Sequence, residues 1–178
     1  MDSRIATSWE RLTTRRDRIL AEFTPWPDEQ LRQRPAPEAW SVIEVIEHLL
    51  LTEKLTFAGV RKNRGAAIPI TLRDRVRAGL VLGVMLLPTR VRIPKGVTAL
   101  APSHADQALS RFVEGWETER RQMREYLATL SGKDLTEGVF KHPVGGWVTV
   151  RGTLIFLESH LLHHGYQLRR IRKDIATD

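Results

Sequence analysis

Four long stretches of this sequence repeat apolar residues at the three- and four-residue spacing of an amphipathic α-helix. We predict helices over residues 3–23, about 41–62, about 103–130 and about 150–173. Prolines follow the first stretch at positions 25 and 27, and a glycine-rich loop at 141–147 precedes the last. Because each apolar stripe must be buried against another, the pattern predicts an all-α fold in the form of a four-helix bundle.

The second predicted helix has the clearest start signal. Ser41 stands at the N-cap position, and Glu44, three residues later, completes a capping box. Trp40 and Val45 stand at the two positions of a hydrophobic staple. Together these signals make residue 41 the expected start of this helix.

The length of 178 residues favours one domain, spanning 1–178, with a sizeable core. The chain has no cysteine, which excludes disulfides, thiolate metal ligands and a thiol nucleophile supplied by the protein. Residues 1–18 carry charges throughout and lack the apolar stretch of a signal peptide. We therefore expect a soluble, cytoplasmic protein.

Positive charge is concentrated between the second and third predicted helices. The net charge is +7, but residues 61–95 hold nine basic residues and one acidic residue, which gives 9 − 1 = +8 and leaves 19 − 20 = −1 elsewhere. Within the insert, about 63–102, residues 71–87 predict a helix that is basic at first and apolar later. Its apolar run is far shorter than the ~20 residues of a membrane crossing.

Four interpretations of this insert stay open: solvated charge beside a packed helix, a lid over a site, a contact with a membrane surface, and a dimer surface. Solvated charge is the favoured one. A nucleic-acid partner is the least favoured, because residues 61–95 contain no aromatic residue and the chain has no recognition motif.

Three of the six histidines fall on apolar faces of the predicted helices. His160 and His164 lie about 40° apart on the helical wheel, in the middle of the apolar stripe of the last helix. His48 lies on the face of the second helix that carries Val45 and Leu55. Bundles build metal sites from such inward side chains, and imidazoles four residues apart can bind one metal ion. The spacing alone leaves ordinary buried histidines as the alternative.

Three motifs resemble the DinB-like (DinB/YfiT-type) family. They are Trp40-Ser41-Val42-Ile43-Glu44-Val45-Ile46-Glu47-His48-Leu49, His142-Pro143-Val144-Gly145-Gly146-Trp147-Val148-Thr149-Val150-Arg151 and His160-Leu161-Leu162-His163-His164-Gly165-Tyr166-Gln167. The resemblance covers nearly the whole chain. It implies a four-helix bundle of the up-down-down-up type and a divalent metal, usually zinc or nickel, bound by His48, His160 and His164. It also implies that a homodimer is among the assemblies to expect.

Three neutral ligands leave a coordination position open, which is typical of catalytic metal sites. We expect a small-molecule substrate and one of two reactions: transfer or addition of a low-molecular-weight thiol to an electrophile, which characterised relatives suggest, or metal-dependent hydrolysis. Glu44 lies one turn before His48 but is expected to serve the helix cap, and Glu47, Glu53 and Glu158 lie off the histidine faces. The lack of an obvious carboxylate base favours thiol transfer, with His163 as the nearest candidate base. A non-catalytic metal-binding, ligand-binding or stress-related protein is the third alternative.

Two further polar residues of the last helix are candidates for a supporting role beside the metal. Gln167 and His163 are placed to hydrogen-bond or to neighbour a ligand. His104, near a predicted helix start, and His142, before a proline, are expected to be exposed or structural.

Overall fold

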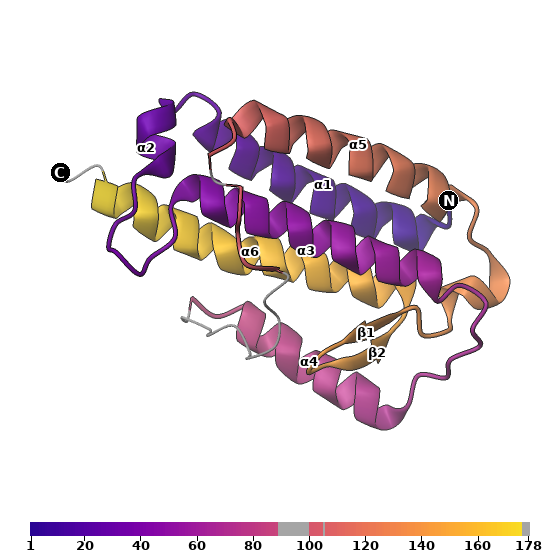
Figure 1. Ribbon diagram of the computed structural model, residues 1–178. Coiled ribbons are helices and arrows are strands. Elements are labelled where there is room, and N and C mark those ends of the chain that lie inside the picture. Colours follow the sequence, from indigo (N-terminus) through magenta and orange to yellow (C-terminus); the bar gives the residue numbers. More distant parts are fainter. Residues whose placement is uncertain (89–99, 105, 176–178) are drawn as a thin grey trace.

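The computed structural model describes residues 1–88, 100–104 and 106–175. Within these residues the chain forms six α-helices, a short 3-10 helix and one β-hairpin (Figure 1). In chain order the elements are α1 (Ser3–Phe23), α2 (Asp28–Arg32), α3 (Val42–Lys62), α4 (Leu72–Met85), α5 (Leu109–Ala128), η2 (Gly132–Leu135), β1 (Phe140–His142), β2 (Gly146–Val148) and α6 (Val150–Ile175). The long helices α1, α3, α5 and α6 form the bundle that the sequence predicts.

The long helices run in two opposite directions. α1 and α6 run one way and α3 and α5 the other, which is the up-down-down-up arrangement (Figure 1). Because α3 and α5 are successive helices of the bundle and run parallel, the chain between them must return along the length of the bundle. A helix of 21 residues is about 30 Å long. α4 runs along the outside of the bundle in the direction opposite to α3 and α5, and so forms part of this returning segment (Figure 1).

One hydrophobic cluster lies between the four long helices. Each of them contributes side chains that are almost completely buried, such as Leu12 of α1, Ile46 of α3, Trp116 of α5 and Leu154 of α6. Burial of these stripes supplies the main favourable free energy of folding. α3 and α6 pack directly on each other, and this contact positions the histidines.

The start of α3 is fixed as predicted. The Ser41 hydroxyl accepts a hydrogen bond from the Glu44 N–H at 3.4 Å, and the Glu44 carboxylate accepts one from the Ser41 N–H at 2.8 Å. Arg34 pairs with the same carboxylate, with its Nε 2.9 Å from Oε2. These contacts fix where α3 begins, and the packing of its apolar face on α6 and α5 turns His48 toward α6.

Three details differ from the sequence prediction. The third long helix starts at Leu109 rather than near residue 103, because the N–H groups of Ser103 and His104 both donate to the Glu47 carboxylate at 3.0 Å. This ties the segment to α3. Leu55 is 47% exposed and does not face the interior. The glycine-rich loop forms the β1–β2 hairpin, so the fold is all-α apart from this small antiparallel pair.

The inserted helix α4 begins with a capping box of its own, between Thr71 and Asp74. The second oxygen of Asp74 accepts a hydrogen bond from the Trp147 N–H of the hairpin at 3.1 Å. Gly146 next to it has φ +75°, and a Cβ there would collide with the Asp74 carboxylate. Glycine is therefore required twice over at this position, by the backbone angle and by the close approach of α4.

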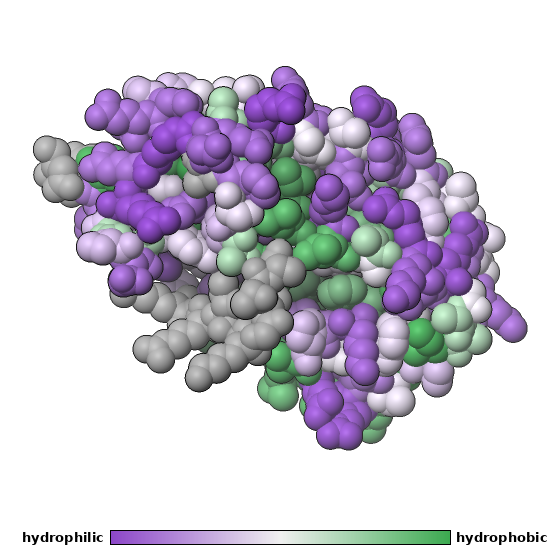
Figure 2. Space-filling view, viewed as in Figure 1, coloured by the Kyte–Doolittle hydropathy of each residue, from purple (hydrophilic) through white to green (hydrophobic). Residues whose placement is uncertain are grey.

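α4 covers the hairpin and α6 on one side only, and none of its residues is fully buried. Its outer face exposes an apolar stripe consisting of Leu72, Val76, Leu80 and Val84. Apolar and hydrophilic side chains lie next to each other over this part of the molecule (Figure 2). No helix among the described residues has the length and hydropathy for a membrane crossing.

Candidate metal centre

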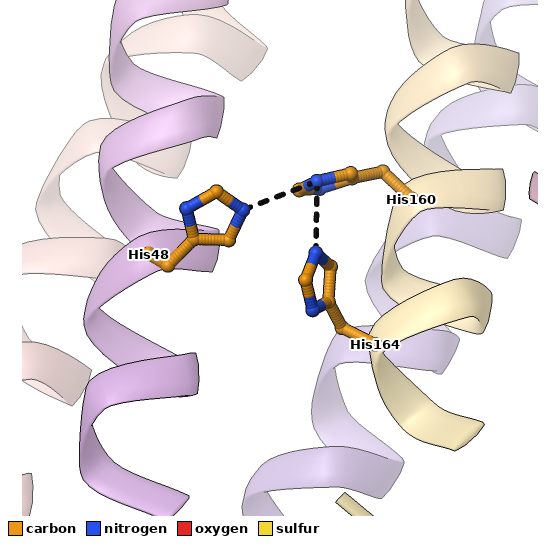
Figure 3. Close-up of side chains that lie close together, drawn as sticks. All are labelled: His48, His160 and His164. Atoms are coloured by element: carbon orange, nitrogen blue, oxygen red, sulfur yellow. Dashed lines mark hydrogen bonds between the residues drawn. The ribbon is translucent and has the colours of Figure 1, made fainter. Parts of the chain in front are cut away.

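The structure brings the three predicted histidines together between α3 and α6 (Figure 3). Nε2 of His160 lies 3.3 Å from Nε2 of His48 and 3.1 Å from Nε2 of His164. His48 and His160 are buried, and His164 is partly buried. Residues 112 positions apart in the chain therefore present their imidazoles to one point.

The outer nitrogens of two of these rings are held by hydrogen bonds. Nδ1 of His48 donates to the carbonyl of Leu100 at 2.8 Å, and Nδ1 of His164 donates to Oε1 of Gln167 at 2.8 Å. A carbonyl oxygen only accepts, so each Nδ1 carries the proton. Each Nε2 then directs a lone pair toward the centre, which is the tautomer that a metal ligand requires.

Burial keeps all three imidazoles neutral. It lowers the pKa of His48, and it lowers the pKa of His160 well below the usual value, with His164 and His48 adding to the effect. Burial, followed by the electrostatic repulsion that a protonated His164 would meet from His48, lowers the pKa of His164 to about 3. At pH 7 the three rings are therefore uncharged, and a metal ion does not have to displace a second proton from any of them.

Two aromatic rings limit the space around the cluster. Trp40 lies beside His48, with 5.0 Å between ring centroids, and Phe156 stacks on His160 at 5.8 Å. His163 makes no hydrogen bond to the cluster, although its ring centroid is 5.4 Å from that of His164. Its buried Nδ1 has no hydrogen-bond partner in the described part of the chain.

The carboxylates nearest in sequence to the histidines are all engaged elsewhere. Glu44 caps α3, Glu47 binds the segment at Ser103, Glu53 pairs with Arg120 and Glu158 pairs with Arg11. Among the described residues the cluster consists of the three histidines alone. The donor set is therefore neutral, and the described part of the chain places no unengaged carboxylate in the cluster as a ready proton acceptor.

Sequence reasoning found the three histidines and Gln167, but it missed the Leu100 carbonyl. A main-chain carbonyl leaves no side-chain signal in a sequence. Leu100 also lies in the insert, about 50 residues from His48, so no helical spacing relates the two. Only the return of the chain past α3 brings them to hydrogen-bond distance.

The fold and the histidine cluster together define a class of small four-helix bundles with a candidate metal centre between two of their helices. The sequence pattern of the DinB superfamily matches residues 11–168 of this chain. The protein therefore belongs to the DinB superfamily, as its three motifs predicted.

Two proteins of Bacillus subtilis are similar to this chain. The uncharacterised protein YuaE of strain 168 is 29% identical over 154 residues, which cover 83% of this chain and 86% of YuaE. The solved structure of YfiT matches with a TM-score of 0.60 at 16% identity, over 99% of this chain and 90% of YfiT. YfiT is described as a probable metal-dependent hydrolase with an unusual four-helix bundle topology. At this level of identity the match establishes the shared fold.

Proposed function

We propose that the protein is a metal-dependent enzyme whose divalent metal, zinc or nickel, is bound by His48, His160 and His164. The observation that carries the proposal is the convergence of three neutral Nε2 atoms. A single proton on His160 Nε2 faces two acceptor nitrogens, whereas a cation contacts all three. Nitrogens bound to one tetrahedral zinc at about 2.0–2.1 Å lie about 3.3 Å apart, close to the spacings of 3.1 and 3.3 Å found here.

When bound, such a metal supplies Lewis-acid activation of a small nucleophile, water or a thiol. The protein would position the metal through its ligands, since Leu100 and Gln167 hold the rings of His48 and His164. The rings of Trp40 and Phe156 pack beside the ligands and would restrict the access of water. Because all three ligands are uncharged, the site keeps the full charge of the cation, which favours the ionised form of that nucleophile.

Transfer or addition of a low-molecular-weight thiol to an electrophile is the first candidate reaction. Hydrolysis usually employs a carboxylate or imidazole beside the metal as a general base. The carboxylates of α3, and Glu158 of α6, are occupied in caps and ion pairs. A thiol already ionises near neutral pH and needs no such base. The thiol must come from outside, since the chain contains no cysteine.

Metal-dependent hydrolysis of a small molecule is the second candidate. The similarity to YfiT favours it, together with His163, whose neutral ring lies next to His164 with a buried nitrogen that has no partner among the described residues. That ring has the chemistry of a proton acceptor.

The metal is tested first. The purified protein and its His48→Ala and His160→Ala variants are analysed for bound zinc and nickel, and circular dichroism checks that each variant keeps its helices. We expect about one metal ion per wild-type chain and a large loss in both variants. Equal metal content in folded wild type and variants would refute the site.

The reaction class is tested on the metal-loaded protein. A panel of bacterial thiols is combined with a model electrophile, and a parallel panel of esters and amides is assayed without thiol. Thiol consumption that needs both the metal and His48 supports transferase chemistry. Metal-dependent turnover of esters or amides alone would replace it with hydrolysis.

A further inference from the structure

A small cavity of about 70 Å³ lies between α4, the hairpin and α6, one helical turn from the histidine cluster. Its walls are almost entirely apolar, formed by Val81 and Leu82 of α4, Val148 of β2, and Phe156 of α6. Among the described residues of this wall, His142, the last residue of β1, is the one with a polar side chain. An apolar cavity with one placed polar group is the usual composition of a small-molecule site.

The hairpin fixes the proton of His142. The N–H groups of Val144 and Gly145 both donate to its Nδ1, at 3.1 and 2.8 Å. Nδ1 is therefore an acceptor, and the proton of the neutral ring lies on Nε2. Burial lowers the pKa of His142, which favours this neutral form. Among the described residues nothing accepts a hydrogen bond from Nε2.

Phe156 connects the cavity with the candidate metal centre. Its ring centroid lies 4.7 Å from that of His142 and 5.8 Å from that of His160. A ligand that fills the cavity therefore contacts a side chain that also packs on His160. This adjacency places the cavity where the non-reacting part of a substrate would lie.

We infer that this cavity binds the apolar part of the substrate and that Nε2–H of His142 donates a hydrogen bond to an uncharged oxygen of that substrate. The ligand class is a small apolar molecule with one acceptor, such as a carbonyl oxygen. His142 is then a positioning residue in the substrate site. The inference rests on the proposed function, since it concerns the substrate of the same centre.

The test compares two probes of the same shape, cyclopentanone and methylenecyclopentane, which differ by C=O against C=CH2. Affinities are measured by NMR titration, following the amides of the hairpin and α4 in the full-length protein. The useful quantity is the ratio of the two affinities, because the different hydration of the probes cancels between protein variants. Loss of one neutral hydrogen bond should change this ratio by about fivefold.

The variants separate ligand binding from a structural role of His142. His142→Asn keeps an acceptor for the Val144 and Gly145 amides but removes the outer donor, so the ratio should shift about fivefold toward the hydrocarbon. His142→Gln extends an N–H donor further and should retain more of the wild-type ratio. Hydrogen exchange of the two amides confirms that the hairpin is intact.

Ala78→Leu places a larger side chain in the cavity and should weaken both probes. Gly79→Ala is the matched control on the same helix, because a Cβ there meets no atom within 4 Å, and it should leave both affinities unchanged. Metal content is measured on the same samples.

An unchanged ratio in His142→Asn with an intact hairpin would overturn the inference, as would probes that fail to respond to Ala78→Leu. If those results occur in a protein that still binds metal through His48, the proposed metal site survives. Wild-type protein without metal but with the expected probe ratios would instead refute the proposed function.

Discussion

At the scale of single residues, the candidate centre depends on orientation as much as on identity. Three imidazoles form a metal site only if each directs a lone pair to the same point. The Leu100 carbonyl and the Gln167 amide fix the proton on the outer nitrogen of His48 and His164. The side chain of Gln167 should therefore influence metal affinity without touching the metal.

Replacing Gln167 with Leu should lower zinc affinity by about 10- to 100-fold, because the His164 ring loses the acceptor that orients it. Gln167→Glu keeps an oxygen acceptor and serves as the matched variant, with affinity at or above that of wild type. Competition with a zinc-binding dye measures both. Equal affinities for the Leu and Glu variants would show that this hydrogen bond has no part in metal binding.

The same buried imidazoles should make the metal-free protein sensitive to acid. Their pKa values are lowered in the folded state, to about 3 for His164, so below the unfolded value of 6.5 the unfolded chain binds more protons. The contribution of these groups to the free energy of unfolding should be constant above pH 6.5 and should decrease as the pH drops toward 3. Each group contributes at most about 1.4 kcal/mol per pH unit.

Urea unfolding of chelator-treated protein between pH 4 and 8 measures this dependence. His164→Gln removes one titrating group and should give a shallower fall. An identical pH profile in this variant would mean that His164 is not protected from protonation in the folded state.

At the scale of elements, the first turn of α4 is anchored to the rest of the molecule by a hydrogen bond. Asp74 joins the helix to the hairpin through the Trp147 N–H, and Gly146 leaves room for that carboxylate. The rest of α4 packs through partly buried residues such as Val81 and Leu82. The inserted helix therefore depends on a side chain and a glycine that lie 72 residues apart.

Gly146→Ala should detach the start of α4 while the bundle stays folded, because the new Cβ collides with Asp74 and the backbone has φ +75°. Amide hydrogen exchange should become faster in α4 and the hairpin but not in α1 or α5. Gly79→Ala, in open space on α4, is the control and should leave exchange there unchanged or slower. Uniformly faster exchange in all helices would contradict this local role.

At the scale of the whole molecule, one buried ion pair joins α3 to α5. Nε of Arg120 lies 2.6 Å from Oε1 of Glu53, and the two side chains are 4% and 2% exposed. Arg120 also reaches Thr13 of α1 and lies over the ring of Trp9. Three helices of the bundle therefore meet at a charged group that cannot be removed alone without leaving an unpaired charge in the core.

Arg120→Met should lower the free energy of unfolding by about 3–5 kcal/mol, because Glu53 is left buried without a partner. The double variant Arg120→Met with Glu53→Leu should recover most of that loss, since two apolar side chains replace the pair. Urea unfolding of the three proteins measures both effects. A double variant no more stable than Arg120→Met would show that the pair contributes through packing rather than charge.

On the outer surface, α4 presents its exposed apolar stripe together with the exposed arginines Arg73, Arg75 and Arg77. Solvated charge stays the favoured interpretation of this face, with a lid, contact with a membrane surface and a homodimer surface as the open alternatives. The cytoplasmic location also stays a prediction. Three further basic residues of the insert, at positions 90, 92 and 95, lie outside the described residues.

The sequence by itself determined the four long helices, the capping box at Ser41, the three histidines and the neighbouring Gln167. Helical period, cap chemistry and i, i+4 spacing are local properties, and a single chain segment expresses them without its partners. The family motifs extended this to the topology of the bundle.

Only the tertiary structure decided what lies opposite those residues. Four features join segments that are distant in the chain. They are the hydrogen bond of His48 to the Leu100 carbonyl, the Glu47 contacts before the start of α5, the Asp74–Trp147 hydrogen bond of α4 and the cavity beside His142. Such contacts depend on the path of the insert between parallel helices. The periodicity of the sequence does not encode that path, because tertiary packing of the insert against the bundle determines it.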